Sequence, residues 1–87
     1  MFSFRPQAGA VDTLLGVMTS QAASPSVQRQ CCMLLRNMVV RNLELRPVFL
    51  GQDAEALLRA AKRLHPKTCS DVGAAALRDL GLDNYND

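Results

Sequence analysis

Two stretches of this 87-residue sequence carry the same pattern of apolar and small residues, 42 positions apart. In each stretch these residues stand at i, i+4, i+7, i+8 and i+11, which is the spacing of one buried face of an α-helix. The matched pairs are Val27/Cys69, Cys31/Gly73, Leu34/Ala76, Leu35/Leu77 and Met38/Leu80. A period of this size is typical of stacked helical repeats, so the sequence predicts two related helical units.

A second set of matches lies between residues 11–18 and 54–61, where four pairs recur 43 positions apart. These pairs are Val11/Ala54, Leu14/Leu57, Leu15/Leu58 and Met18/Ala61. The predicted unit therefore consists of a short, a medium and a long helix, and the first unit lacks its short helix. This division predicts a partial repeat over residues 1–41, a second repeat over 42–82 and a polar tail over 83–87.

Local signals set the expected helix boundaries. Ser24 followed by Pro25 is a favourable N-cap and first helical residue, and Asp12 suits the first turn of the helix before them. Asp53 is expected to cap the helix that follows it, while Gly51 suits the left-handed conformation just past a short helix. The sequence predicts five helices, which span about 10–20, 25–41, 46–50, 54–64 and 66–80.

The first unit leaves apolar surface without an upstream neighbour. The medium helix of this unit carries Val11, Leu14, Leu15 and Met18. Only Phe2 and Phe4 precede it as large apolar residues that could cover this side. We therefore expect the isolated chain to self-associate through its N-terminal edge.

Composition and charge argue against a disordered, a nucleic-acid-binding and a membrane-spanning chain. Hydrophobic residues make up 48% of the chain, which favours an ordered helical core over a disordered segment. The formal net charge of +2 is spread along the chain, which is too mild to imply nucleic-acid binding. Polar residues interrupt each apolar stretch before it reaches the ~20 residues that a membrane span needs. We also expect no secretory signal at the start of the chain.

The sequence contains three cysteines, Cys31, Cys32 and Cys69, and one histidine, His65. An odd number of cysteines with an adjacent pair does not suit a disulfide framework. We expect reduced thiols that pack as small hydrophobic groups, in a protein of the cytoplasm and/or nucleus. The spacing of zinc ligands is not present, so we expect neither a metal nor a cofactor. No catalytic constellation surrounds His65, which stands beside Pro66, and we expect no enzyme activity.

A three-helix unit of about 42 residues with a Gly-Ala start, a Leu-Leu middle and a Leu-x-Asn-Leu end resembles the armadillo repeat. Here these elements are Gly9-Ala10, Leu14-Leu15 and residues 35–38, and the second copy departs from the pattern at Asp53 and Asp79. Residues 53–81 are similar to the last repeat of an armadillo-repeat protein. The resemblance implies an all-α fold, a right-handed superhelix (α-solenoid) fragment of about two repeats and five helices. It also implies a scaffold that binds a partner protein or peptide.

The resemblance further implies a binding surface on the long third helices, which line a concave groove in armadillo proteins. An Asn on these helices binds the backbone of an extended peptide there, and Asn37 matches that residue. The predicted partner-binding residues are Arg29, Met33, Arg36, Asn37, Arg41, Asp71, Ala75, Arg78 and Asp79. The strip on the first repeat is basic and the next is acidic, so each is expected to prefer a ligand of opposite charge. Asn37 has an equally weighted alternative, a structural bond to a neighbouring loop carbonyl.

An alternative function is weak RNA binding through a basic cluster. The cluster consists of Arg29, Arg36, Arg41 and Arg46. Asp71 and Asp79 would oppose an RNA ligand on the next repeat, and aromatic residues for base stacking are absent from the cluster. Protein binding is therefore the favoured prediction.

Overall fold

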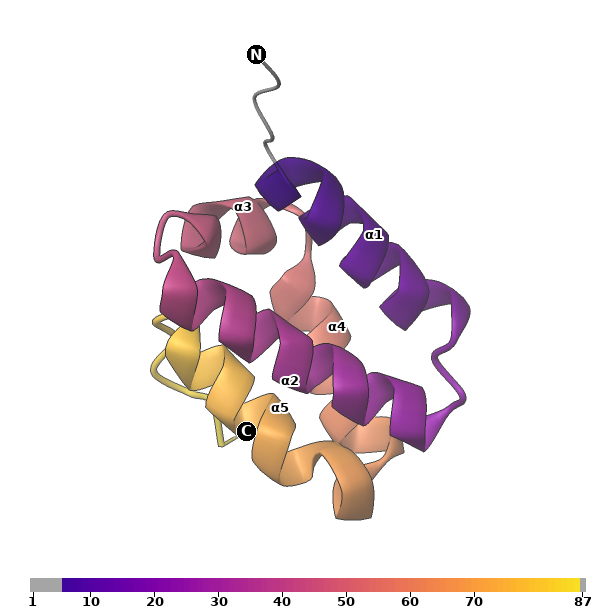
Figure 1. Ribbon diagram of the computed structural model, residues 1–87. Coiled ribbons are helices and arrows are strands. Elements are labelled where there is room, and N and C mark those ends of the chain that lie inside the picture. The colour runs from indigo at the N-terminus through magenta and orange to yellow at the C-terminus, as the bar shows by residue number, and fades with distance from the viewer. Residues whose placement is uncertain (1–5, 87) are drawn as a thin grey trace.

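The computed structural model describes residues 6–86, and within this range it contains five α-helices and no strand (Figure 1). The helices are α1 (Pro6–Ser20), α2 (Pro25–Arg41), α3 (Leu45–Gly51), α4 (Ala54–Leu64) and α5 (Pro66–Asp79). The predicted all-α class and the five helices are confirmed for this part of the chain. Phe2 and Phe4, which were expected to cover the N-terminal edge, lie outside the described residues.

The predicted starts of α1 and α2 have different outcomes. Ser24 caps α2 as predicted, because its side chain accepts a hydrogen bond from the N–H of Val27 at 3.4 Å. Helix α1 begins at Pro6, which suits a first helical position, so Asp12 lies in the second turn and the prediction for the first turn is wrong. The cap at Ser24 depends only on residues close in sequence, which is why it is predictable.

The turn between α3 and α4 is formed differently from the prediction. Gly51 is the last residue of α3, and the left-handed residue is Asp53, with φ of 67°. The N–H of Gln52 donates to the carbonyl of Phe49, which closes α3 and moves the chain reversal to Asp53. Asp is one of the few residues other than Gly that tolerates this conformation. Its side chain makes no capping hydrogen bond, so the predicted cap at Asp53 is wrong.

The two long helices, α2 and α5, lie side by side in the front of Figure 1, and α4 lies behind them. Helix α4 packs closely on α5, whereas α1 rests on α2 along a less extensive contact. Helix α3 contacts α1, α2 and α4. The second long helix is therefore enclosed on two sides, and the first has a more open side toward α1.

The core contains side chains from all five helices. The largest fully buried ones are Phe49, Met18, Leu35, Leu58, Leu77, Val11, Val39, Cys32 and Cys69. The predicted inward orientation of Leu35, Leu58 and Leu77 is confirmed, and Leu57 is partly buried. Each large aliphatic side chain that is fully buried contributes about 1.5–3 kcal/mol of hydrophobic free energy. The four apolar side chains of α1 that have no upstream neighbour, including Val11 and Met18, are buried, because α1 turns this face toward the other helices.

The buried face of α2 is rotated from the repeated pattern. Leu34 is 50% exposed and Met38 is only partly buried, whereas the residues one position further along, Leu35 and Val39, are buried. In the second unit, by contrast, all five positions of the pattern are buried. The prediction of a buried Leu34 is wrong because α5 packs against one side of α2, and α1 leaves the other side partly open.

Gln28 is a buried polar residue that joins α1 to α2. It is 3% exposed, and its Nε2 donates hydrogen bonds to the carbonyls of Met18 and Gln21, both at 3.0 Å. The Met18 carbonyl lies in the last turn of α1, where the helix supplies no further N–H, and the Gln21 carbonyl just after it also accepts from the N–H of Ser24 at 3.0 Å. Gln28→Ala should lower the free energy of unfolding by about 1–3 kcal/mol, measured by urea denaturation. Gln30→Ala, on the exposed side of the same helix, should change it by less than about 0.5 kcal/mol; equal losses would contradict this role of Gln28.

Candidate functional site

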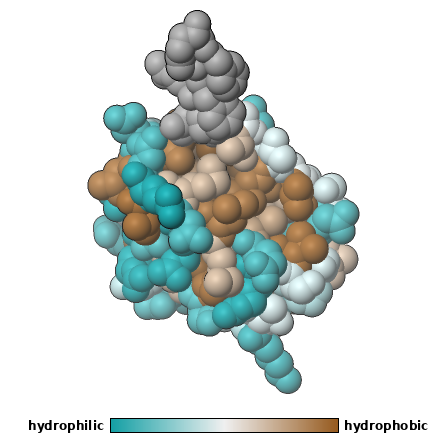
Figure 2. Space-filling view, viewed as in Figure 1, coloured by the Kyte–Doolittle hydropathy of each residue, from teal (hydrophilic) through white to brown (hydrophobic). Residues whose placement is uncertain are grey.

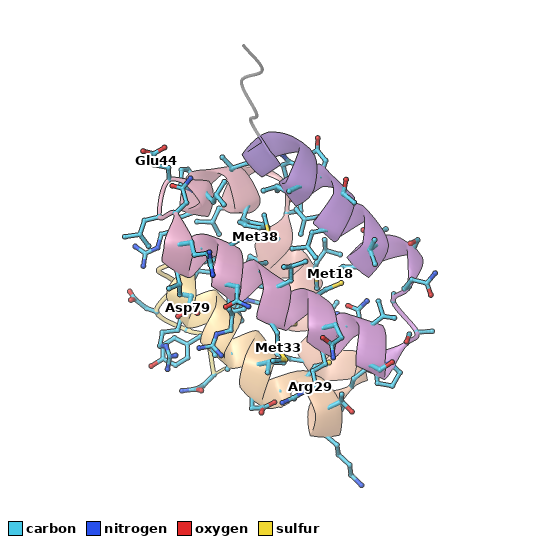
Figure 3. All side chains as sticks on the ribbon, in the orientation of Figure 1. Met18, Arg29, Met33, Met38, Glu44 and Asp79 are labelled. Atoms are coloured by element: carbon cyan, nitrogen blue, oxygen red, sulfur yellow. The ribbon has the colours of Figure 1, made fainter. Side chains whose placement is uncertain are left out.

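The basic and acidic strips predicted on the long helices lie against each other. Arg29 Nη1 is 3.2 Å from Asp71 Oδ1, and it also donates to the carbonyl of Thr68 at 2.6 Å. Arg36 Nε is 2.9 Å from Asp79 Oδ2. Figure 3 shows Arg29 and Asp79 along the α2–α5 seam. The structure thus brings these four predicted residues together as ion pairs within the chain, and their charges are largely balanced before any ligand arrives.

Further contacts hold the acidic strip in place. Arg46 Nε donates to the carbonyl of Asp79 at 2.8 Å, and Arg78 Nε lies 3.8 Å from the Asp79 carboxylate. The pKa of Asp71 is lowered, chiefly because its carboxylate accepts a hydrogen bond from the N–H of Val72 and then because Arg29 donates to it. Since the folded state favours the ionised carboxylate, any stabilisation from Asp71 is present above its unfolded pKa and is lost as the pH falls through the lowered pKa.

The remaining predicted residues are distributed over three places. Met33, Arg36, Asn37 and Val40 line a small hollow of about 200 Å³ on α2. Met33 and Asn37 are exposed there, Ala75 is partly buried on α5, and Arg78 is exposed at the end of that helix. Arg41, which was predicted to join the same row, instead lies at the rim of a larger groove.

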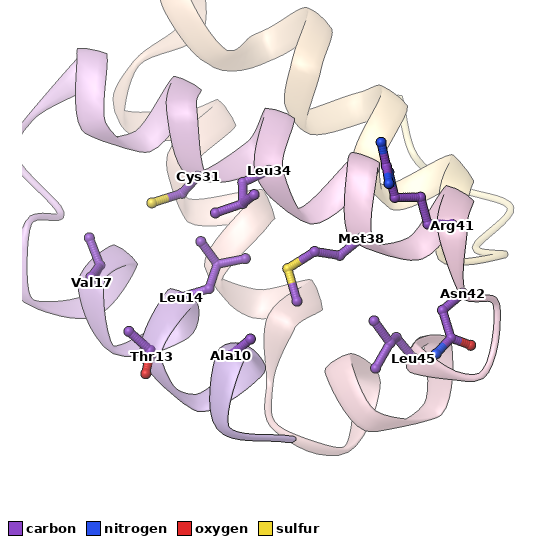
Figure 4. Close-up of a pocket in the computed structure, with 10 residues that line it drawn as sticks. All are labelled: Ala10, Thr13, Leu14, Val17, Cys31, Leu34, Met38, Arg41, Asn42 and Leu45. Carbon is purple, nitrogen blue, oxygen red and sulfur yellow. The ribbon is translucent and has the colours of Figure 1, made fainter. Parts of the chain in front are cut away.

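This larger groove, between α1 and α2, is a feature that the sequence reasoning missed. It has a volume of about 700 Å³ and an almost wholly apolar lining (Figure 4). The lining residues are Ala10, Thr13, Leu14, Val17, Cys31, Leu34, Met38, Arg41, Asn42 and Leu45. Figure 2 shows apolar side chains gathered in the middle of this face with polar residues around them. We call this feature the α1–α2 groove.

The groove follows much of α2. A smaller hollow of about 280 Å³ shares Val17, Cys31 and Leu34 with it and extends it to Ser26. The combined lining reaches from Ser26 to Asn42, so at ~1.5 Å per helical residue it is about 25 Å long. A sequence signal for it exists, because α2 has apolar residues on two adjoining faces, one with Leu35 and one with Leu34. A helix that packs on one neighbour alone needs only one such face.

The three cysteines are buried in the core, and the histidine links two connections between helices. Burial raises the pKa of Cys31 and Cys69, and it raises that of Cys32 to about 12, with a further contribution from the nearby Cys69 thiol. These thiols are neutral at physiological pH and poor nucleophiles. The His65 ring lies 2.8 Å from the carbonyl of Ala22 and links the α4–α5 junction to the α1–α2 loop. Residues 6–86 contain no cluster of three or more His, Cys, Asp or Glu side chains that would hold a metal ion.

Comparison with protein-family models, with curated proteins and with solved structures finds no match for this chain. The armadillo resemblance is therefore still a prediction, and it depends on the repeated residues themselves. None of the helices in the described range has the length and apolar character needed to cross a membrane. The evidence that the α1–α2 groove is a binding site therefore comes from its own geometry and chemistry.

Proposed function

We propose that this chain is a protein-interaction module that binds an amphipathic helix of a partner protein in the α1–α2 groove. The observation that carries this proposal is the groove itself, which is apolar, is left uncovered by the described residues and is about as long as α2. An amphipathic helix in an apolar groove is a recurring mode of peptide recognition.

The groove has a physical cause in the repeated pattern. At the positions of Cys31 and Leu34, the second unit has the smaller residues Gly73 and Ala76, which are buried where α4 packs on α5. The larger side chains of the first unit hold α1 away from α2. The same helix pair is therefore closed in the second unit and open in the first.

We further propose that the two units form a short armadillo-like superhelix. Contacts between residues about one repeat apart support it. They include Arg29 with Asp71, Ala22 with His65, and Pro25, whose carbonyl accepts from Cys69 Sγ at 3.7 Å. Such contacts are expected where one unit stacks on the next in the same orientation.

The rim of the groove indicates the charge of the partner. Arg41 is exposed at one end and makes no salt bridge with any residue of the described range. Val17 and Leu34, which are 36% and 50% exposed, supply apolar contact further along. The partner helix should therefore present apolar residues at i, i+3 or i+4, and i+7, with an acidic residue at the end that meets Arg41.

RNA binding has less support from the geometry. Arg29 and Arg36 are paired with aspartates, and Arg46 donates to a backbone carbonyl. Of the predicted basic cluster, only Arg41 presents a charge that is not engaged by the described residues. One such charge provides little of the phosphate neutralisation on which nucleic-acid affinity depends.

The proposal can be tested with a displayed library of amphipathic helical peptides that vary at apolar and charged positions. Selection against the 87-residue chain should enrich helices with the apolar spacing and the acidic end residue. For one selected peptide, Leu34→Asp should weaken binding about 10- to 100-fold, because it puts a charge where a leucine is buried on binding. Arg41→Glu should weaken it as well.

Val40→Asp is the matched control, since Val40 is 68% exposed on the same helix and does not line the groove. It should leave the affinity within about twofold. Peptides whose binding is unaffected by Leu34→Asp would exclude the groove as the binding site. Sedimentation of the free chain tests the predicted self-association, and a dimer that Leu34→Asp dissociates would identify a second copy as the occupant instead.

A further inference from the structure

A second, polar hollow lies beside α4, on surface that does not belong to the α1–α2 groove. Its volume is about 460 Å³, and it is lined by Arg59, Lys62, Arg63, Ser70, Asn84 and Asn86. Two helices and the C-terminal segment contribute to it. Three of the six lining residues are cations, and none is an acid.

Lys62 is the least expected member of this hollow, because it is only 9% exposed. Its aliphatic stem lies so close to Gly73 that a Cβ at position 73 would collide with Lys62 Cγ. Its ammonium group donates a hydrogen bond to the carbonyl of Tyr85 and makes no salt bridge with a described residue. The stem is thus packed against α5, while the residue lines the hollow and has no described counter-charge, so an anion there would supply one.

Arg59, at the edge of the same hollow, is held in position by three hydrogen bonds. Its Nε donates to Glu55 Oε2 at 3.0 Å, and its Nη1 and Nη2 donate to the backbone carbonyl and side chain of Asn84 at 3.0 and 2.9 Å. Glu55 balances one positive charge, while the charges of Lys62 and Arg63 are unbalanced within the described residues. Because the guanidinium is already ordered, a ligand would lose little of its binding free energy to ordering this side chain.

We propose that this hollow binds an oxyanion of the phosphate class. Lys62, Arg59 and Arg63 supply the charge, and Ser70 and Asn86 supply neutral donors. Phosphate oxygens accept several hydrogen bonds at once, and arginine and lysine are their usual partners. The Lys62 ammonium group has three N–H donors. One of them is used by the hydrogen bond to the Tyr85 carbonyl, so two remain for a ligand.

The test is a titration of the ¹⁵N-labelled 87-residue chain with inorganic phosphate at constant ionic strength, followed by NMR. Saturable shifts are expected at Arg59, Arg63, Ser70 and Asn86 at millimolar phosphate. Arg63→Gln removes an exposed charge and should weaken binding about five- to tenfold. Lys67→Gln removes one positive charge from an exposed position outside the hollow and should change it less than about twofold.

O-phosphoserine in place of phosphate distinguishes the two sources of this chemistry. Tighter binding of phosphoserine would identify a phosphorylated side chain as the ligand, and equal or weaker binding would identify the free anion. Shifts that do not saturate, or equal effects of the two variants, would overturn the proposal.

Discussion

Phe49→Ala is expected to lower the free energy of unfolding by about 3–5 kcal/mol, the range for deleting a buried aromatic side chain. Phe49 is fully buried, and among the described residues it is the largest of the fully buried side chains. It lies on α3, which contacts α1, α2 and α4, so the cavity would open where four helices meet. Small domains have only about 5–15 kcal/mol of stability. Urea denaturation followed by circular dichroism should show a clearly lower midpoint.

Leu50→Ala is the control for this variant, because Leu50 is the next residue of α3 and is 36% exposed. It should cost less than about 1 kcal/mol, since much of its side chain stays in water when the protein is folded. If the two variants unfolded at the same urea concentration, α3 would not anchor the core. The remaining helices would then have to form a stable unit without it.

Leu35→Ala should lower the free energy of unfolding by about 2–5 kcal/mol. Leu35 is fully buried on α2, which packs against each of the other four helices of the described range. The neighbouring Leu34→Ala removes the same atoms from a position that is 50% exposed. It should cost less than about 1 kcal/mol. The difference between the two variants, measured under identical conditions, tests the rotation of the buried face directly.

A larger loss from Leu34→Ala than from Leu35→Ala would restore the face that the repeat pattern predicts. It would also imply that the α1–α2 groove is closed in solution. The stabilities of Leu34→Ala and Leu35→Ala therefore test both the packing of α2 and the exposure of the groove, without any binding measurement.

The helices were predictable because their signals are local. Ser24 and Pro25 start α2, and the 3.6-residue period extends through each helix, so these features need no knowledge of distant residues. The chain reversal at Asp53 was not predictable, because Gly51 and Asp53 both tolerate the left-handed conformation. The choice depends on where α3 closes, and this is a property of the folded turn.

In the candidate sites, too, single residues could be recognised from the sequence, but the contacts between them could not. Charged positions such as Arg29 and Asp71 were recognised one by one, but their pairing requires the register between α2 and α5. Gln28 was not recognised at all, because a polar residue within a helix reads as solvent-exposed until its acceptors on α1 are placed beside it. Lys62 on α4 likewise reads as a solvent-exposed residue from the sequence, although it is only 9% exposed.

By itself, the sequence determined that residues 6–86 form five helices, roughly where each begins and ends, and which residues share a helical face. Only the tertiary structure decided which of two apolar faces of α2 is covered, and that the other lines an open groove with Leu34 exposed in it. It also decided that the predicted charged strips pair with each other. The physical reason is that helical periodicity depends on the chain within a few residues. What lies opposite a face depends on the packing of side chains such as Cys31 and Gly73, which are far apart in sequence.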